Sequence, residues 1–263
     1  MDYSQILSQQ FNIKEEYAKN IIALLDDGNT IPFIARYRKE MHGSMDDQLI
    51  REFAEKLEYL RGLDKRRDEI RSLIDAQEKL TDEINLALDK AATLSELEDI
   101  YRPYRPKRKT RASIAKEKGL EPLANDILKQ EKGFDPSKSA VDYIDEEKGV
   151  TSVEDAIQGA MDIIAELVSD NAEIRKRIRN LTNANGVLVS VATDEEKDSV
   201  YKNYYDYKEP VKKIAGHRVL AVNRGEKEGF LKVSVETDSE KPLNSIFRAM
   251  ITDKNQLCSD IIR

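Results

Sequence analysis

The sequence has 263 residues, a formal net charge of −7 and 35% charged residues, against a typical share of about 25%. The acidic balance excludes a protein that coats nucleic acid or anionic lipid with its whole surface. No apolar run reaches about 18 residues, so the sequence predicts no membrane-spanning helix. The single cysteine, Cys258, excludes an internal disulfide framework and favours a reducing, cytoplasmic setting.

Apolar residues recur at helical spacing in the first part of the chain. The pattern predicts helices over residues 3–10 and 14–27, an irregular connection or single helical turn over 30–43, one long helix over 46–79, and shorter helices over 81–90 and 95–101. In the long helix the apolar stripe is Leu49, Phe53, Leu57, Leu60 and Leu63. Such a helix is long enough to brace several shorter ones.

The rest of the chain changes character near Gly186. Helices are expected over 121–130, 137–144, 153–169 and 171–180, then strands over 187–192, 217–223 and 230–236. Gly225 and Gly229 suggest a turn that makes 217–236 a β-hairpin. The fold class is therefore mainly α. We expect a helical region over 1–182, with a long spine helix, and a small α/β segment over 183–263, with the hairpin and a C-terminal helix.

One basic segment stands out from the acidic chain. From Tyr101 to Lys118 there are eight Lys or Arg residues and one acid, Glu117. In its YRPYRP portion the prolines lie three apart, which is the period of polyproline II. That conformation would project Arg102 and Arg105 the same way, between Tyr101 and Tyr104. The Arg111-Ala112-Ser113 sequence then predicts the start of another helix, whose amides would favour an anion.

Four interpretations of the basic segment remain open. It could contact phosphates or a single strand of nucleic acid, because arginine, lysine and tyrosine suit both. It could be a solvated loop whose tyrosines are structural. It could dock on an acidic protein surface, or serve as a PxxPxR ligand for a proline-reading domain.

The sequence shows little that would support catalysis. It has two histidines, His42 and His217, and no phosphate-binding loop or nucleophile elbow. The acid runs 145–147 and 194–196 are more typical of solvated loops and helix starts than of a metal site. We therefore expect no enzyme, no cofactor, no metal and no small-molecule substrate.

Four stretches resemble the N-terminal region of Tex-type bacterial transcription accessory proteins. They are TIPFIARYRKE (30–40), LEDIYRPYRPKRKTRASIAKEKGLEPLA (97–124), GAMDIIAELVSDNAEIRKRIR (159–179) and YYDYKEPVKKIAGHRVLAVNRGEKEGFLKVSV (204–235). The resemblance implies a cytoplasmic nucleic-acid-binding protein with a helix-turn-helix-like portion, a ribonuclease-H-like domain, helix-hairpin-helix elements and an OB-fold RNA-binding domain. It also implies that this sequence ends before the ribonuclease-H-like domain is complete, so that its own binding to DNA or RNA is weak.

The leading hypothesis is a non-enzymatic transcription accessory module that contacts nucleic acid without reading its sequence. The alternative is a scaffold that docks on RNA polymerase or another partner. The candidate site residues are Tyr101, Arg102, Tyr104, Arg105, Lys107, Arg108, Lys109 and Arg111.

Other basic and aromatic groups are secondary. Arg36, Arg38 and Lys39, beside Phe33 and Tyr37, could contact a nucleic-acid backbone, although packed aromatics and arginine–acid pairs are favoured there. The basic helix around 175–179 favours a solvated face. Packing, rather than base stacking, is favoured for a group of tyrosines next to the expected strands: Tyr201, Tyr204, Tyr205 and Tyr207.

Overall fold

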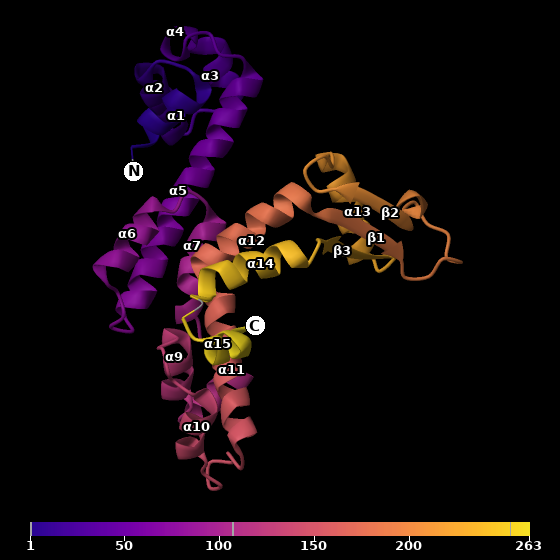
Figure 1. Cartoon of the computed structure of the whole chain (residues 1–263). Coiled ribbons are helices and arrows are strands. Elements are labelled where there is room, and N and C mark those ends of the chain that lie inside the picture. The colour runs from indigo at the N-terminus through magenta and orange to yellow at the C-terminus, as the bar shows by residue number, and fades with distance from the viewer. Residues whose placement is uncertain (1, 107, 253) are drawn as a thin grey trace. The chain divides into compact units, whose positions relative to one another are not determined.

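The computed structural model of the chain describes residues 2–106, 108–252 and 254–263. The described residues form a mainly helical fold with one small antiparallel sheet, which confirms the expected fold class (Figure 1). Contacts divide the chain into two compact units, Met1–Tyr104 and Arg105–Arg263. The first strand was expected soon after residue 182, and it begins at Val187, inside the second unit. The contacts thus divide the chain at a different place from the expected regions 1–182 and 183–263.

The described residues of the first unit form helices joined by short connections. The region expected as irregular chain or a single turn is two short helices: Pro32 lies in the first turn of one, where its missing N–H costs nothing, and Gly43, with φ 65°, ends the other. The remaining expected helices are present. The elements are α1 (Tyr3–Phe11), α2 (Glu15–Asp26), α3 (Ile31–Tyr37), α4 (Lys39–His42), α5 (Asp47–Asp75), α6 (Asp82–Lys90), α7 (Leu94–Tyr101) and the 3₁₀ helix η1 (Arg102–Tyr104).

The long helix α5 organises this unit. Its N-terminus is capped by Asp46, whose side chain accepts the Leu49 N–H at 2.8 Å. One half of its buried stripe packs with α1, α2 and α3, and the other half packs with α6 and α7. The stripe has helical spacing and one polar member, Arg67, in the set Ile50, Phe53, Leu57, Leu60, Leu63, Arg67, Ile70 and Ile74.

Arg67 is buried and ties α5 to the end of α6. Its Nε donates to the Leu88 carbonyl at 2.9 Å, and its Nη2 donates to the Ala91 carbonyl at 3.0 Å. Its Nη1 pairs with the Asp64 carboxylate, which also accepts the Tyr3 hydroxyl at 2.8 Å. Every part of the guanidinium thus has a partner, as a buried charge requires.

The second unit combines helices with the sheet. The helix expected over 171–180 runs five residues further, to Asn185, and the single C-terminal helix that was expected is two helices. The elements are α8 (Arg111–Glu117), α9 (Glu121–Lys129), α10 (Pro136–Ala140), η2 (Val141–Tyr143), α11 (Val153–Asp170), α12 (Ala172–Asn185), β1 (Val187–Ala192), η3 (Lys202–Tyr204), β2 (Asp206–Pro210), α13 (Gly216–Lys227), β3 (Leu231–Glu236), α14 (Glu240–Met250) and α15 (Gln256–Ile262).

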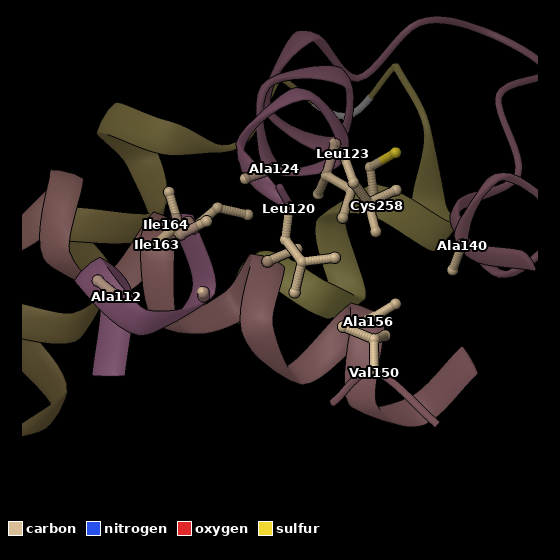
Figure 2. Packing of buried hydrophobic residues seen from close by; sticks show 13 residues of the cluster. Ala112, Leu120, Leu123, Ala124, Ala140, Val150, Ala156, Ile163, Ile164 and Cys258 are labelled. Atoms are coloured by element: carbon tan, nitrogen blue, oxygen red, sulfur yellow. The ribbon is translucent and has the colours of Figure 1, made fainter. Parts of the chain in front are cut away.

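The core of this unit lies among α8, α9, α11 and α15 (Figure 2). Leu120, Leu123 and Ile163 are fully buried there, together with the thiol of Cys258. Asn255 joins α15 to the end of α9, because its Nδ2 donates to the carbonyls of Glu131 and Phe134, both at 2.7 Å. Contacts between residues more than a hundred positions apart therefore hold this core together.

The sheet has the strand order β2-β1-β3, with both pairs antiparallel. The strands expected over 187–192 and 230–236 are confirmed as β1 and β3, and β2 was not expected. The strand expected over 217–223, and hence the hairpin over 217–236, is wrong, because those residues lie in α13. The β-branched side chains suggested a strand, but Val219, Val222 and Gly225 recur every three residues on the helix, and α13 packs on β3.

Candidate functional site

The candidate residues of the basic segment fall on both sides of the division between the units. Tyr101, Arg102 and Tyr104 belong to the first unit, and Arg105 begins the second. Lys107 lies outside the described residues. Each set is therefore described within its own unit.

The polyproline II conformation expected for YRPYRP is wrong. The helix α7 runs through Tyr101, and residues 102–104 continue as the 3₁₀ helix η1. Arg102 is in the right-handed helical region, with φ −52° and ψ −43°, even though a proline follows it. Pro103 is tolerated because a residue in the first turn needs no N–H partner. The Tyr104 carbonyl accepts the side-chain amide of Gln77 at 2.9 Å, which fixes the end of this turn.

Burial of Tyr101 explains why the segment stays helical. The side chain is only 7% exposed and packs in the core formed by α5, α6 and α7. The guanidinium of Arg66 lies 5.6 Å from the centroid of its ring. Arg66 in turn pairs with Glu98 at 2.7 Å and with Glu69 at 3.1 Å. The Tyr101 ring is used inside the unit, so it holds the segment in place and offers no free face for a base.

In the second unit, the basic segment leads into α8 through a capping box, which confirms the expected helix start at Arg111. The Thr110 hydroxyl accepts the Ser113 N–H at 3.0 Å, and the Ser113 hydroxyl accepts the Thr110 N–H at 2.8 Å. Thr110 also donates to Glu166 on α11 at 3.1 Å. Because the capping box occupies the Ser113 amide, the helix start has less capacity for an anion than its sequence suggested.

The exposed cations of the segment have weak partners. Arg108 forms no hydrogen bond or ion pair within the described part of the chain. Lys109 lies 3.4 Å from Glu117, and Arg111, with a side chain 85% exposed, lies 3.6 Å from Asp162 on α11. Pairs of this kind contribute about 0–1 kcal/mol, so an incoming anion can displace them. Lys118, by contrast, donates to the Gly149 carbonyl at 2.6 Å and is a structural residue.

Of the three secondary candidate cations, Arg36, Arg38 and Lys39, only Arg38 contacts an aromatic ring among the described residues. Arg38 lies 5.4 Å from the centroid of the Phe33 ring, and Phe33 in turn packs against Tyr37. Arg36 and Lys39 are exposed. Across residues 2–106, none of the three cations pairs with a carboxylate, and Tyr37 is 64% exposed, so the expectation of packing is met only by the contacts of Phe33.

The tyrosines near the sheet have partners within the fold, as expected. The rings of Tyr204 and Tyr207 lie 5.1 Å apart, and the Tyr205 hydroxyl donates to the Ser199 hydroxyl at 2.9 Å.

Tyr201 is buried beside Phe230 and donates to the Glu228 carboxylate at 2.9 Å. Hydrogen bonds from Arg224 and Tyr201 hold the pKa of Glu228 below its usual value. These contacts stabilise the sheet and its covering helix.

The acidic runs form turns. The Asp145 carboxylate accepts the N–H groups of Glu147 and Lys148, at 3.1 and 3.2 Å, and Asp194 does the same for Glu196 at 3.1 Å. No group of three His, Cys, Asp or Glu residues gathers with metal-ligand geometry among the residues that the structure describes.

Burial raises the pKa of the Cys258 thiol, which keeps it protonated near neutral pH.

An apolar groove of about 630 Å³ lies among α11, α12, α14 and α15. Its apolar lining includes Met161, Ile178 and Phe247, and Arg175 and Arg179 also line it. This groove could not be predicted from the sequence, because it depends on the pairing of α12 with α14. The amphipathic pattern of α14 was the available signal.

The geometry describes a mainly helical protein with an exposed, weakly paired basic segment. The segment Arg108–Arg111 lies at the start of α8 in a unit whose helices carry a small sheet. No described helix is long and apolar enough to cross a membrane.

Comparison with known proteins identifies the family. Residues 1–75 match the Tex-like protein N-terminal domain, and residues 131–261 match the Tex central region-like family. The chain belongs to the Tex family, as its four stretches suggested.

Similar proteins from several organisms support this assignment. The chain is 42% identical to the uncharacterized protein YdcI of Bacillus subtilis, over 100% of this chain and 38% of that protein. It is 39% identical to the transcriptional accessory protein Tex of Neisseria gonorrhoeae, over 90% and 31%. It is 31% identical to the human S1 RNA-binding domain-containing protein 1, over 89% and 24%. The chain thus spans between a quarter and two fifths of the length of these relatives.

Proposed function

We propose that the chain is a non-enzymatic, nucleic-acid-binding part of a bacterial transcription accessory protein, acting in the cytoplasm. It would contact the sugar–phosphate backbone of DNA or RNA without reading sequence. The observation that carries this proposal is the set of exposed, weakly paired cations at Arg108, Lys109 and Arg111. Membership of the Tex family and the names of the relatives support it.

The proposal assigns different roles within the basic segment. Arg105, Arg108, Lys109 and Arg111 are exposed and would meet phosphates. Arg102 and Lys107 complete the set of cations proposed from the sequence. Tyr101 and Tyr104, which pack in the core of the first unit, would support the segment rather than stack on bases. A helix-turn-helix-like portion, implied by the family resemblance, stays a prediction.

Salt dependence tests this mechanism. If the basic segment neutralises about four phosphates, it should contribute about −3 to −4 to the slope of log K against log salt. Replacing Arg108, Lys109 and Arg111 together by glutamine should make the slope shallower by about 2 to 3. Fluorescence anisotropy of a labelled duplex and a labelled single strand, between about 50 and 200 mM salt, measures both quantities.

A matched control is available in the first unit. Lys65, Lys79 and Lys90 are exposed lysines of α5, of the connection that follows it, and of α6. Their replacement by glutamine removes the same charge and should leave the slope almost unchanged. A wild-type slope near zero, or an equal change in the control, would overturn the proposal.

The second candidate function is a protein-interaction scaffold for RNA polymerase or another partner. The apolar groove among α11, α12, α14 and α15 favours it. With Arg175 and Arg179 among its lining residues, the groove suits an amphipathic helix with acidic residues beside its apolar face. Loss of a partner in a pull-down with Phe247→Asp, at unchanged nucleic-acid affinity, would favour the scaffold.

A further inference from the structure

The helices α12 and α14 pack side by side (Figure 1). They also share a second, polar groove. Four residues of α14 line it, at positions i, i+3, i+4 and i+7, which places them on one helical face. Two residues of α12, four positions apart, line the other wall. The groove has a volume of about 480 Å³ and is lined by Arg177, Leu181, Lys241, Asn244, Ser245 and Arg248.

The lining of this groove is basic and polar. It contains three cations, two neutral hydrogen-bonding side chains and one apolar side chain, Leu181. The acids of the two helices, Glu173 and Glu240, are outside the lining. Six cations and two acids lie on α12 and α14 together, although the whole chain is acidic. The positive charge is therefore concentrated on this helix pair.

The three cations of the groove are not used by the fold. Arg177, Lys241 and Arg248 are exposed, and none forms a hydrogen bond or ion pair through its side chain within residues 108–252. Arg71 on α5 shows the opposite arrangement, since it binds Asp68 at 2.6 Å and Asp89 at 2.7 Å. Three cations held together without carboxylates repel each other, and an anion in the groove would relieve that repulsion.

We propose that the groove between α12 and α14 binds the sugar–phosphate backbone of a nucleic acid, as a surface additional to the one formed by Arg105, Arg108, Lys109 and Arg111. Arginine, lysine, asparagine and serine are the side chains that most often contact phosphate oxygens. The lining stripe of α14 covers about 10 Å, which matches about three phosphates at the axial rise of one strand. No aromatic side chain lines the groove, so the groove would contact the sugar–phosphate backbone and would not stack on bases.

The inference is independent of the site proposed above, because the two surfaces share no residue. It predicts that phosphate contact in this chain is divided between two surfaces of the second unit. The total salt slope should then be the sum of two separable contributions.

The test compares four proteins: the wild-type chain, a groove variant, the basic-segment variant, and a variant that combines both. The groove variant carries Arg177→Gln, Lys241→Gln and Arg248→Gln. Its log K against log salt should become shallower by about 2 to 3 for a labelled duplex of arbitrary sequence. The combined variant should lose both contributions.

Two controls keep the result specific. Replacing Lys208, Lys212 and Lys213 by glutamine removes three exposed lysines of the same unit outside the groove, and the slope should not change. Replacing Arg177 and Arg248 by lysine keeps the charge and should preserve the slope. Thermal unfolding of each variant should match the wild-type chain, since the replaced side chains are exposed.

Each outcome decides the inference. An unchanged slope in the groove variant overturns it, while the proposed function stands if the basic-segment variant loses affinity. A shallower slope in the groove variant alone supports the inference and removes the basic segment as a site. If the groove variant lost binding to a labelled polyglutamate peptide and kept its affinity for the duplex, the groove would be assigned to an acidic protein and the inference would be overturned.

Discussion

Three arginines of α5 and two of the basic segment, all within the described residues, carry the same charged group, but only the three of α5 are held by strong contacts within the fold. Arg66, Arg67 and Arg71 each bind carboxylates or backbone carbonyls inside the first unit. In the second unit, Arg108 has no such partner among the described residues, and the exposed Arg111 side chain lies 3.6 Å from one carboxylate, that of Asp162. The difference shows that the number of positive charges in a stretch of sequence says little about a binding surface. Whether the fold already uses those charges is what decides.

The strongest test of this comparison is Arg67→Met. The substitution leaves the carbonyls of Leu88 and Ala91 without donors and removes a partner of Asp64. Breaking a buried ion pair in this way costs about 3–5 kcal/mol of the free energy of unfolding. Urea denaturation measures it. Arg61→Met is the control: Arg61 is 42% exposed where it pairs with Asp26, and its loss should cost about 1 kcal/mol or less. Equal effects would contradict the assignment of Arg67 as structural.

A glycine substitution tests whether residues 216–227 form a helix packed on β3 rather than a strand of a hairpin. A Cβ at Gly225 would lie 2.6 Å from Leu231 Cδ1, with Tyr201 on another side at 3.0 Å. Gly225→Ala should therefore destabilise the packing of α13 on β3 by about 1–3 kcal/mol. In thermal unfolding, Gly216→Ala should be neutral or slightly stabilising, because a Cβ at Gly216 meets nothing within 4 Å. If Gly225→Ala were as stable as Gly216→Ala, the close approach would be refuted.

The pair of Asp26 and Arg61 predicts a small pH effect. Hydrogen bonds from Arg61, at 2.7 and 2.8 Å, hold the pKa of Asp26 below its usual value. The ionised carboxylate therefore adds stability above about pH 4, and this is lost as the pH falls through the lowered pKa. Asp26→Asn should remove that part of the acid dependence, with a loss of about 1 kcal/mol or less near neutral pH. Identical acid-unfolding profiles for both proteins would argue against the pair.

The smallest expected effect on stability is that of Arg108→Glu. This side chain is exposed and has no partner in the described part of the chain, so the free energy of unfolding should change by about 0.5 kcal/mol or less. Urea denaturation at low and moderate salt checks it. A loss comparable to that of Arg67→Met would mean that the segment is structural.

The elements with long apolar stripes could be predicted from the sequence. The spacing of Phe53, Leu57 and Leu60 predicted α5, and the apolar run after Gly186 predicted β1. Residues 217–223 were mistaken for a strand because β-branched propensity is a weak signal beside packing on β3. The polyproline II expectation failed because burial of Tyr101 outweighs the local preference of a residue before proline.

The candidate site was only partly predictable. The sequence located the basic segment and the helix start at Arg111. It could not tell which cations the fold uses, since the backbone carbonyls that accept from Arg67 and Lys118 belong to residues 21 to 31 positions away. The basic groove was missed for the same reason, because Arg177 and Arg248 are brought together only by the packing of α12 on α14.

The most direct measurement is the salt slope of nucleic-acid binding for the variant that carries Arg108→Gln, Lys109→Gln and Arg111→Gln. The proposed mechanism predicts a slope shallower than the wild-type value by about 2 to 3, with unfolding unchanged. A slope equal to that of the wild-type chain would contradict phosphate contact by the basic segment.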